Sequence, residues 1–264
     1  MDNALIGYTG FVGSTLHRQR DYGAVYRSTN IDEIDGKTFG RVACAAAPGQ
    51  KWIANRDPLG DQQRIDGLIA HLETIRCDEF VLLSTVDVFL TPVGVDETSP
   101  VVEDGLHAYG LNRRRLEKFV EAYFPKHLIV RLPGLVGPGL RKNVLFDFLN
   151  DNNVHLIDSR GSFQFYPMVN LSYDIDRALA AGLRLVHLTA EPITVSKASS
   201  EGFGKPFEQH VGDRAASYDM RSLHASLFGG TGHYQYSARE TLQAVRSYAQ
   251  TEQRTLPAPT GAHT

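Results

Sequence analysis

Three side chains in the sequence have the types and the spacing of a proton-transfer site. Tyr109 and Arg113 lie four residues apart in a predicted helix, so they share one of its faces. A cation beside a tyrosine stabilises the phenolate and lets the phenol exchange a proton closer to neutral pH. Thr85 ends an apolar run, and its hydroxyl is available to hydrogen-bond a substrate oxygen. The alternative is that Tyr109 and Arg113 are an ordinary pair on a helix surface.

A glycine-rich turn near the N-terminus has the spacing of a phosphate cradle. The turn follows the apolar run Ala4-Leu5-Ile6 and precedes a predicted helix over 13–20. Glycines in this context allow a tight turn and a close approach of a pyrophosphate to the backbone, and the start of the helix offers unpaired N–H groups. We therefore predict a dinucleotide-binding turn. The cradle residues expected at the cofactor are Gly7, Gly10, Phe11, Val12 and Gly13.

The residues after the second predicted strand, Ala24-Val25-Tyr26, bear on which dinucleotide binds. An acidic residue at this point holds the ribose 2′-hydroxyl of NAD, whereas an arginine suits the 2′-phosphate of NADP. The chain has Arg27 and Ser28 there. We therefore expect NADP, with NAD as the other option. The alternative for Arg27 is a solvated side chain that stacks on the adenine.

Strands that alternate with helices predict a doubly wound, mostly parallel sheet of the Rossmann type. Buried strands are expected over 42–47, 80–84 and 127–132, and helices over 61–76 and 106–124. The connection between the second strand and residue 42 is too short for a further strand and helix, because a βαβ unit takes about 30 residues or more. The predicted fold class is α/β with one edge strand missing.

The pattern loosens after residue 140. We assign 1–140 to the dinucleotide-binding domain, 141–250 to a small substrate lobe interleaved with the sheet, and 251–264 to a disordered tail. The run Arg141-Lys142-Asn143 either grips a phosphate or carboxylate or caps the next helix. Three further helices are expected, over 143–149, 171–181 and 238–249.

The composition excludes several classes of protein. Hydrophobic residues make up 42%, charged residues make up 22%, and the net charge is −3, so neither nucleic acid nor an anionic membrane is an expected partner. The run Arg113-Arg114-Arg115 is interpreted as the solvated face of a helix. Cys44 and Cys77 lack metal-site spacing, so no metal is expected and a reducing cytoplasm fits best. We also expect no signal peptide and no membrane span.

Together these motifs resemble the short-chain dehydrogenase/reductase superfamily, in its extended branch of sugar-nucleotide epimerases, dehydratases and reductases. The resemblance covers the first 140 residues. Residues 163–170 resemble, more weakly, a segment of the family's substrate lobe. Its carrying segments, in family order, are the glycine turn, Ser84-Thr85-Val86-Asp87-Val88-Phe89, Tyr109 to Arg113, and Arg131-Leu132-Pro133-Gly134-Leu135-Val136-Gly137-Pro138.

The resemblance implies roles for individual residues. Thr85 matches the catalytic Ser/Thr, and Tyr109 matches the acid/base tyrosine. Ala45 and Ala46 fall on the strand end that lines the cofactor, and Pro133, with the glycine after it, falls near the nicotinamide.

Two positions bear on the reaction type. Asp87 matches a carboxylate with which the dehydratases remove a proton from the sugar ring, but Val86 lacks the acid that they carry beside it. Arg113 stands where the family has a lysine that holds the nicotinamide ribose and lowers the tyrosine pKa. Arginine keeps the charge but differs in length and shape, so it either performs this task with shifted geometry or marks a protein without ordinary hydride chemistry.

Three functions follow as hypotheses. The first is an NAD(P)-dependent oxidoreductase or epimerase that acts on a sugar nucleotide or a related polar hydroxy or keto metabolite. The second is a sensor or scaffold that binds the dinucleotide without hydride transfer. The third is a lyase or isomerase in which Asp87 removes a carbon-bound proton. A homodimer through the helix over 106–124 is a further expectation, since helix pairing between subunits is common in the family.

Overall fold

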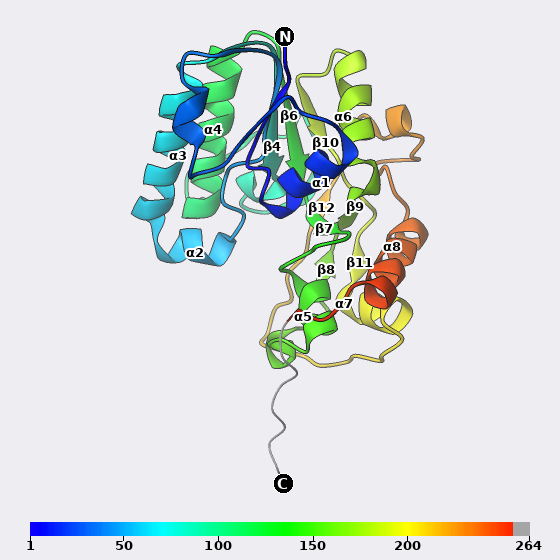
Figure 1. Ribbon diagram of the computed structural model, residues 1–264. Coiled ribbons are helices and arrows are strands. Elements are labelled where there is room, and N and C mark those ends of the chain that lie inside the picture. Colours follow the sequence, from blue (N-terminus) through cyan, green and yellow to red (C-terminus); the bar gives the residue numbers. More distant parts are fainter. Residues whose placement is uncertain (256–264) are drawn as a thin grey trace. The chain divides into compact units, whose positions relative to one another are not determined.

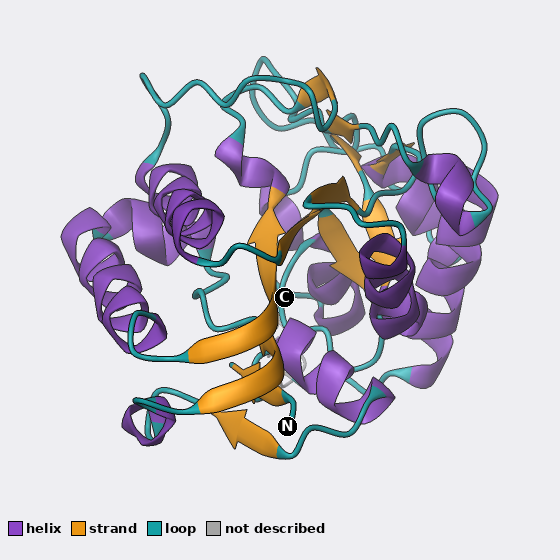
Figure 2. Ribbon diagram, turned by 90° about the horizontal axis from the view of Figure 1, so that it is seen from above, coloured by secondary structure: helices purple, strands orange, loops and turns teal. Residues whose placement is uncertain are grey.

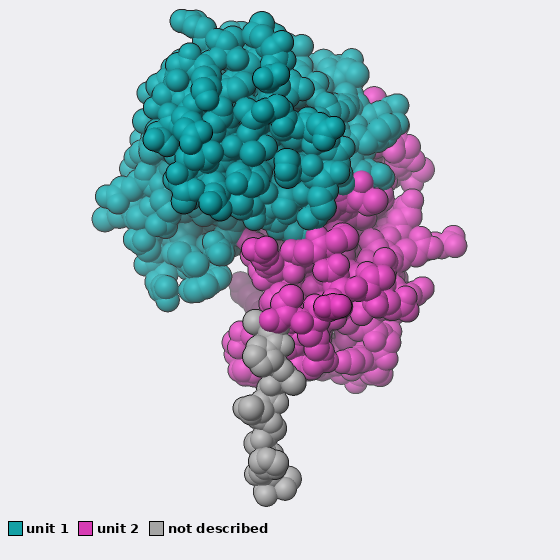
Figure 3. All heavy atoms as spheres, in the orientation of Figure 1, with its two compact units in different colours: residues 1–92, 96–132, 170–188 teal, residues 93–95, 133–169, 189–264 magenta. Residues whose placement is uncertain are grey.

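The computed structural model describes residues 1–255, which form two compact units (Figure 1, Figure 3). Unit 1 consists of residues 1–92, 96–132 and 170–188. Unit 2 consists of residues 93–95, 133–169 and the described residues from 189 onward. Most of the predicted tail, over 256–264, lies outside the described residues.

A parallel sheet of six strands forms the centre of unit 1, in the order β10-β6-β4-β3-β1-β2. All neighbouring strands run parallel. This arrangement confirms the predicted α/β fold of the Rossmann type. The strands are β1 (Ala4–Ile6), β2 (Ala24–Tyr26), β3 (Thr38–Cys44), β4 (Arg76–Thr85), β6 (His127–Leu132) and β10 (Leu185–His187).

The prediction of a missing edge strand is also confirmed. β2 ends the sheet, and between β2 and β3 the chain forms only a 3₁₀ turn, Ile31–Ile34. Two boundaries were wrong. β3 begins at Thr38 and ends at Cys44, so residues 45–47 belong to the loop that follows. The helix predicted over 61–76 ends at Leu72, and β4 already begins at Arg76. Lys37 and Thr38 are more polar than a buried strand suggests, and Thr38 lies exposed at the strand's start.

Helices cover both faces of this sheet (Figure 2). On one side, α3 and α4 pack against each other and α2 contacts both; on the other side, α1 contacts α6 (Figure 1). Apolar residues of the strands and of the inner stripes of α3 and α4 form the core, including Ile65, Leu82 and Val120. These helices are α1 (Phe11–Gln19), α2 (Lys51–Arg56), α3 (Pro58–Leu72), α4 (Ala108–Tyr123) and α6 (Leu171–Ala180).

Unit 2 is built on three short strand pairs, β5–β12, β7–β9 and β8–β11. The buried amide of Gln164 ties its segments together, because it donates to Thr189 Oγ1 at 2.7 Å and accepts from Met220 N at 2.6 Å. The strands are β5 (Val93–Val95), β7 (Gly134–Val136), β8 (Ser162–Phe163), β9 (Phe165–Pro167), β11 (Ile193–Thr194) and β12 (Asp219–Met220). The helices are α5 (Val144–Asn150), α7 (Val195–Lys197) and α8 (Ala238–Thr251).

Local capping explains where two of these helices begin. The Asn143 side chain accepts from Leu145 N at 2.9 Å at the start of α5, which is the capping alternative for the 141–143 run. Ser237 and Glu240 form a capping box at the start of α8. Within residues 1–255, no helix has the length and apolar character that crossing a membrane requires.

Candidate active site

The glycine turn between β1 and α1 has the geometry of a phosphate cradle. Gly7 has φ +86°, and a Cβ there would lie 2.5 Å from the Ala45 carbonyl oxygen; a Cβ on Gly13 would overlap the Gly7 carbonyl oxygen. Gly10 is the N-cap of α1 and contributes no side-chain cap, so no capping side chain occupies the first N–H groups of the helix. These backbone features fit a bound pyrophosphate.

Three chain segments meet at this turn. Gly7 N donates to the carbonyl of Tyr26, the last residue of β2, at 2.8 Å, and Ala45 N donates to Ile6 O at 2.8 Å. Arg27 and Ser28, which follow Tyr26, are therefore carried to the edge of the cradle, where both are exposed. Arg27 Nε donates to Thr29 Oγ1 at 2.8 Å.

The remaining predicted cofactor residues lie at two places. Ala46 adjoins Gly7, because a Cβ on that glycine would lie 2.7 Å from the Ala46 Cα. Pro133 directly follows β6 and belongs to unit 2. Its assignment to the cofactor site stays a prediction.

The predicted catalytic residues converge at the carboxyl end of β4. Thr85 ends the strand, and its Oγ1 accepts from Asp87 N at 3.2 Å in the 3₁₀ turn Val86–Val88, here η2. The turn packs on the start of α4, since a Cβ on Gly110 would overlap the Asp87 carbonyl oxygen. This packing brings Tyr109 close to Thr85, whose side chain acts to lower the pKa of the phenol.

Arg113 is buried against Tyr109. Its guanidinium carbon lies 4.1 Å from the centre of the Tyr109 ring, and only 3% of the residue is exposed. The guanidinium donates to Asp61 Oδ2 and to the Pro48 carbonyl oxygen. The alternative of a surface helix pair is therefore wrong, because Tyr109 is buried too.

The interpretation of the arginine run as a solvated face also needs correction. Arg114 pairs with the fully buried Glu117 at 2.9 Å, and its side chain is only 17% exposed, so it is not a freely solvated residue. Arg115 alone of the three has a side chain that is about half exposed, at 51%. The run spans more than one face of α4, and two of its members pair with buried carboxylates.

The pKa of Tyr109 is raised above its ordinary value. Burial of the phenol is the largest cause, and the Asp87 carboxylate adds to it. Arg113, the Thr85 side chain and Lys51 act in the opposite direction but do not outweigh burial. The sequence-based expectation that a neighbouring cation brings the phenol closer to neutral pH is therefore wrong in its net sign, although right about the effect of Arg113.

Four residues of this site were not predicted from the sequence. Lys51 Nζ lies 2.6 Å from Asp87 Oδ1, and Asn55 Oδ1 accepts from Tyr109 N at 3.0 Å. Asp61 holds Arg113 from α3, and Pro48 holds it from the loop before α2.

A single loop, residues 45–50, joins the two halves of the site. Its first residues pack against Gly7 in the cradle, and the Pro48 carbonyl accepts from Arg113 beneath Tyr109. The cradle and the predicted catalytic residues Thr85, Asp87, Tyr109 and Arg113 all belong to unit 1. The glycine turn and the tyrosine are thus parts of one continuous arrangement.

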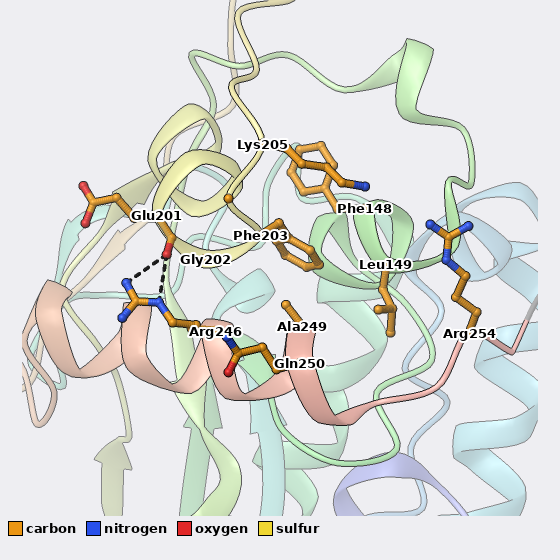
Figure 4. Close-up of a pocket in the computed structure, with 11 residues that line it drawn as sticks. Phe148, Leu149, Glu201, Gly202, Phe203, Lys205, Arg246, Ala249, Gln250 and Arg254 are labelled. Carbon is orange, nitrogen blue, oxygen red and sulfur yellow. Dashed lines mark hydrogen bonds between the residues drawn. The ribbon is translucent and has the colours of Figure 1, made fainter.

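Unit 2 contains a separate hollow of about 370 Å³ that none of the predicted site residues line (Figure 4). Phe148, Leu149 and Phe203 give it an apolar side. Its arginines are engaged in local contacts: Arg246 donates twice to the Glu201 carbonyl oxygen, at 3.0 and 3.2 Å, and Arg254 pairs with an aspartate at 2.7 Å. We therefore place the candidate site in unit 1.

No cluster of three or more His, Cys, Asp or Glu side chains within residues 1–255 is arranged to hold a metal ion.

Comparison with known proteins gives no match to a family model and no match to a curated protein sequence. Solved structures do match over nearly the whole chain, and they include sugar-nucleotide reductases, epimerases and dehydratases.

Three of these structures show the extent of the likeness. A dTDP-4-dehydrorhamnose reductase from Clostridium acetobutylicum has a TM-score of 0.72 and 17% identity, covering 94% of this chain and 98% of that chain. The dTDP-glucose 4,6-dehydratase DesIV from Streptomyces venezuelae, with NAD bound, has a TM-score of 0.71 and 16% identity, covering 95% and 98%. A dTDP-4-dehydrorhamnose reductase from Bacillus anthracis, in complex with NADP, has a TM-score of 0.68 and 15% identity, covering 94% and 97%.

This is the fold of the extended short-chain dehydrogenases/reductases. The predicted resemblance is confirmed at the level of the fold. In this chain the sheet ends at β2, where the sequence predicted that an edge strand would be missing.

Proposed function

We propose that the protein is an NADP-dependent oxidoreductase, or a related epimerase, that acts on a sugar nucleotide or a similar polar hydroxy or keto metabolite. The observation that carries the proposal is the buried Tyr109 residue, whose phenol pKa responds to Thr85 and whose partner Arg113 is joined to the glycine cradle through one loop. Reductases and dehydratases of sugar nucleotides with the same fold support the substrate class. One of them is in complex with NADP and another with NAD.

The residues of the chain divide the work between binding and proton transfer. A bound nicotinamide dinucleotide would supply or accept the hydride. The N–H groups at the start of α1 bind its pyrophosphate, and Arg27 binds the 2′-phosphate. Thr85 Oγ1 donates a hydrogen bond to the substrate oxygen. Tyr109 gives its phenolic proton to that oxygen when a carbonyl is reduced.

The protonation state of Tyr109 suits it to the role of proton donor. A phenol of ordinary pKa is already protonated at neutral pH, and burial raises the pKa of Tyr109 further. The phenol therefore carries the proton that the substrate oxygen takes up when a carbonyl is reduced. We infer that Tyr109 acts as the acid in the reduction of a keto sugar.

Tyr109→Phe tests the proposal directly. Wild-type protein is screened for NADPH oxidation against 4-keto sugar nucleotides, and the variant is then measured on the substrate that reacts. We expect turnover to fall roughly 10²- to 10⁴-fold, with NADPH affinity nearly unchanged because the ring is replaced by one of the same shape. Unchanged turnover in the variant would rule out Tyr109 as the acid.

Arg27→Ala tests the choice of cofactor. We expect NADPH to bind roughly tenfold more weakly, about 1.4 kcal/mol, because the 2′-phosphate loses a charged donor. NADH affinity should not change. Fluorescence titration of both cofactors provides the measurement. The matched control is Arg76→Ala, which removes an exposed arginine at the first residue of β4, at the other end of that strand from Thr85. Equal weakening of both cofactors would contradict the assignment.

A dinucleotide sensor without hydride transfer is the second candidate. The engagement of Arg113 by Asp61 and Pro48 favours it, because these contacts occupy donors with which the guanidinium could otherwise reach a ribose. Tight NADPH binding with no turnover across the substrate panel supports this candidate, and clear turnover removes it. A cytoplasmic location and a homodimer through α4 remain expectations of either function.

A further inference from the structure

We propose that Lys51 is a positioning residue of the active site: its ammonium group balances the Asp87 carboxylate, and through that balance it controls the charge state of Tyr109. The inference rests on the proposed role of Tyr109 as the acid. It assigns a function to α2, which the sequence motifs did not include, and it separates the tasks of the two cations beside the tyrosine.

The geometry of α2 directs two of its side chains at the catalytic residues. Lys51 is the first residue of α2, and its Nζ lies 2.6 Å from Asp87 Oδ1. Asn55 follows one turn later on the same face and accepts from Tyr109 N at 3.0 Å. The helix is thus fixed to the start of α4 by one residue and reaches the carboxylate with another.

The position of Asp87 is set by its backbone. Its N–H donates to Thr85 Oγ1 at 3.2 Å, and its carbonyl packs against Gly110, where no Cβ fits. Gly110 directly follows Tyr109 in the chain, and Thr85 and Asp87 both act on the Tyr109 pKa. The backbone of Asp87 therefore cannot move without disturbing η2 and the first turn of α4, and a cation that neutralises its carboxylate acts on the phenol as well.

Lys51 and Arg113 differ in how far they can respond to a ligand. Arg113 is 3% exposed and is held by Asp61 and Pro48 on two sides. The Lys51 side chain is 37% exposed and that of Asp87 is 17% exposed. The Lys51–Asp87 pair therefore lies at the solvent side of the site, where a substrate or cofactor can reach it, whereas Arg113 is a fixed part of the interior.

The charged and titratable groups around Tyr109 come from α4, η2, α2 and the residue before α4. Arg113 lies on its own helix, Asp87 on η2, Lys51 on α2, and His107 directly before α4. Burial raises the Tyr109 pKa most; beyond that, Arg113 and Lys51 lower it and Asp87 raises it. The same pair acts on the imidazole of His107, whose pKa is lowered first by burial and then by Lys51, with Asp87 opposing.

The opposite signs of Lys51 and Asp87 give a test that a merely structural ion pair would fail. Both Lys51→Met and Asp87→Asn break the same contact, so a structural role predicts the same change in both. The proposal predicts that Lys51→Met raises the Tyr109 pKa and that Asp87→Asn lowers it, each by roughly a three- to tenfold change in proton affinity. The double variant should return close to wild type.

The measurement is a pH titration by ¹⁹F NMR of protein labelled with 3-fluorotyrosine, which titrates at lower pH than tyrosine. The resonance of residue 109 is the one that disappears in Tyr109→Phe. Lys118→Met is the matched control, since Lys118 is an exposed lysine that pairs with Glu103 and lies on the same helix as the tyrosine; it should leave the titration unchanged. Lys51→Arg keeps the charge and should keep most of the wild-type value.

Shifts of the same sign in Lys51→Met and Asp87→Asn, or no shift in either, would overturn the inference. Thermal unfolding of each variant shows that the titrated protein is folded. Because the titration needs no substrate, its failure is distinct from failure of the proposed function: opposite shifts with no turnover on any substrate would count against the enzyme, and turnover without opposite shifts would count against Lys51.

Discussion

Glu117→Ala is expected to lower the free energy of unfolding by about 3–5 kcal/mol, because it leaves a buried arginine without its counter-ion. Glu117 has no exposed surface. Its two carboxylate oxygens accept from Arg131 Nε at 2.9 Å and Arg131 Nη2 at 2.8 Å, and they also accept from Ser84 Oγ at 2.6 Å and from Arg114 at 2.9 Å. The carboxylate thereby joins α4 to the two central strands β4 and β6.

Denaturation by urea or guanidinium chloride with linear extrapolation measures this loss. The matched control is Glu121→Ala, which removes the other carboxylate that pairs with Arg114, at 2.9 Å. The Glu121 side chain is 40% exposed, so its removal should cost less than about 1 kcal/mol. A cost below about 1 kcal/mol for Glu117→Ala itself would mean that water or relaxed packing compensates the charge of Arg131.

The contribution of Glu117 should also depend on pH in a defined direction. Burial alone would raise its pKa, but the hydrogen bonds and charge of Arg131, aided by Ser84 and Arg114, outweigh burial and hold the pKa below its ordinary value of 4.5. Folding then favours the ionised form, so the stabilisation is complete above that pH and is lost as the pH falls through the folded-state pKa. The stability difference between wild type and Glu117→Gln should narrow on acidification.

The sequence predicted the sheet well because its strands are buried on both faces. Such strands consist of nearly continuous apolar runs, and in 80–84 and 127–132 the only polar residues are Ser84, His127 and Arg131. The missing strand was also predictable, because the short connection after Tyr26 limits what the chain can form. The glycine turn was predictable for a local reason: its backbone conformation depends on residues within seven positions of one another.

The buried charges could be detected from the sequence but not paired. Asp61 occupies the same helical stripe as Ile65 and Leu72, and Glu117 occupies that of Val120, so each carboxylate interrupts an apolar face. This interruption signals burial. It does not identify the partner, because Arg113 and Arg131 lie on other segments and reach these carboxylates only through packing of one element on another.

Lys51 carried no signal of this kind. It follows Pro48-Gly49 at the start of a helix of six residues, where a lysine is an ordinary solvated residue. Its contact with Asp87 depends on how the loop 45–50 places α2 beside α4. Residues positioned by a loop between a strand and a short helix have no periodicity in the sequence, which is why this part of the site emerged only from the structure.

Asp61→Ala should be comparably destabilising, by about 3–5 kcal/mol, because it leaves the Arg113 guanidinium buried without a counter-ion. Asn112 Nδ2 also loses its acceptor, which lies at 2.8 Å. Both partners come from α4, so the substitution loosens the helix that carries Tyr109. Chemical denaturation gives the stability. Asp66→Ala, an aspartate on the same helix whose pair with Arg115 is solvent-accessible, is the control and should cost less than about 1 kcal/mol.

The double variant Asp61→Leu/Arg113→Met separates the structural task of this ion pair from its task beside the tyrosine. Replacing both charges with apolar side chains of similar volume is expected to restore most of the stability that Asp61→Ala loses, since neither charge is then left uncompensated. The ring of Tyr109 nevertheless loses the cation stacked on it at 4.1 Å, which acts to lower the phenol pKa. We therefore expect stability to return while turnover stays low and the Tyr109 titration moves to higher pH. If turnover recovers together with stability, Arg113 serves only to hold α3 and α4 together. The pKa of the Tyr109 phenol is then adjusted by Lys51 and Asp87 instead.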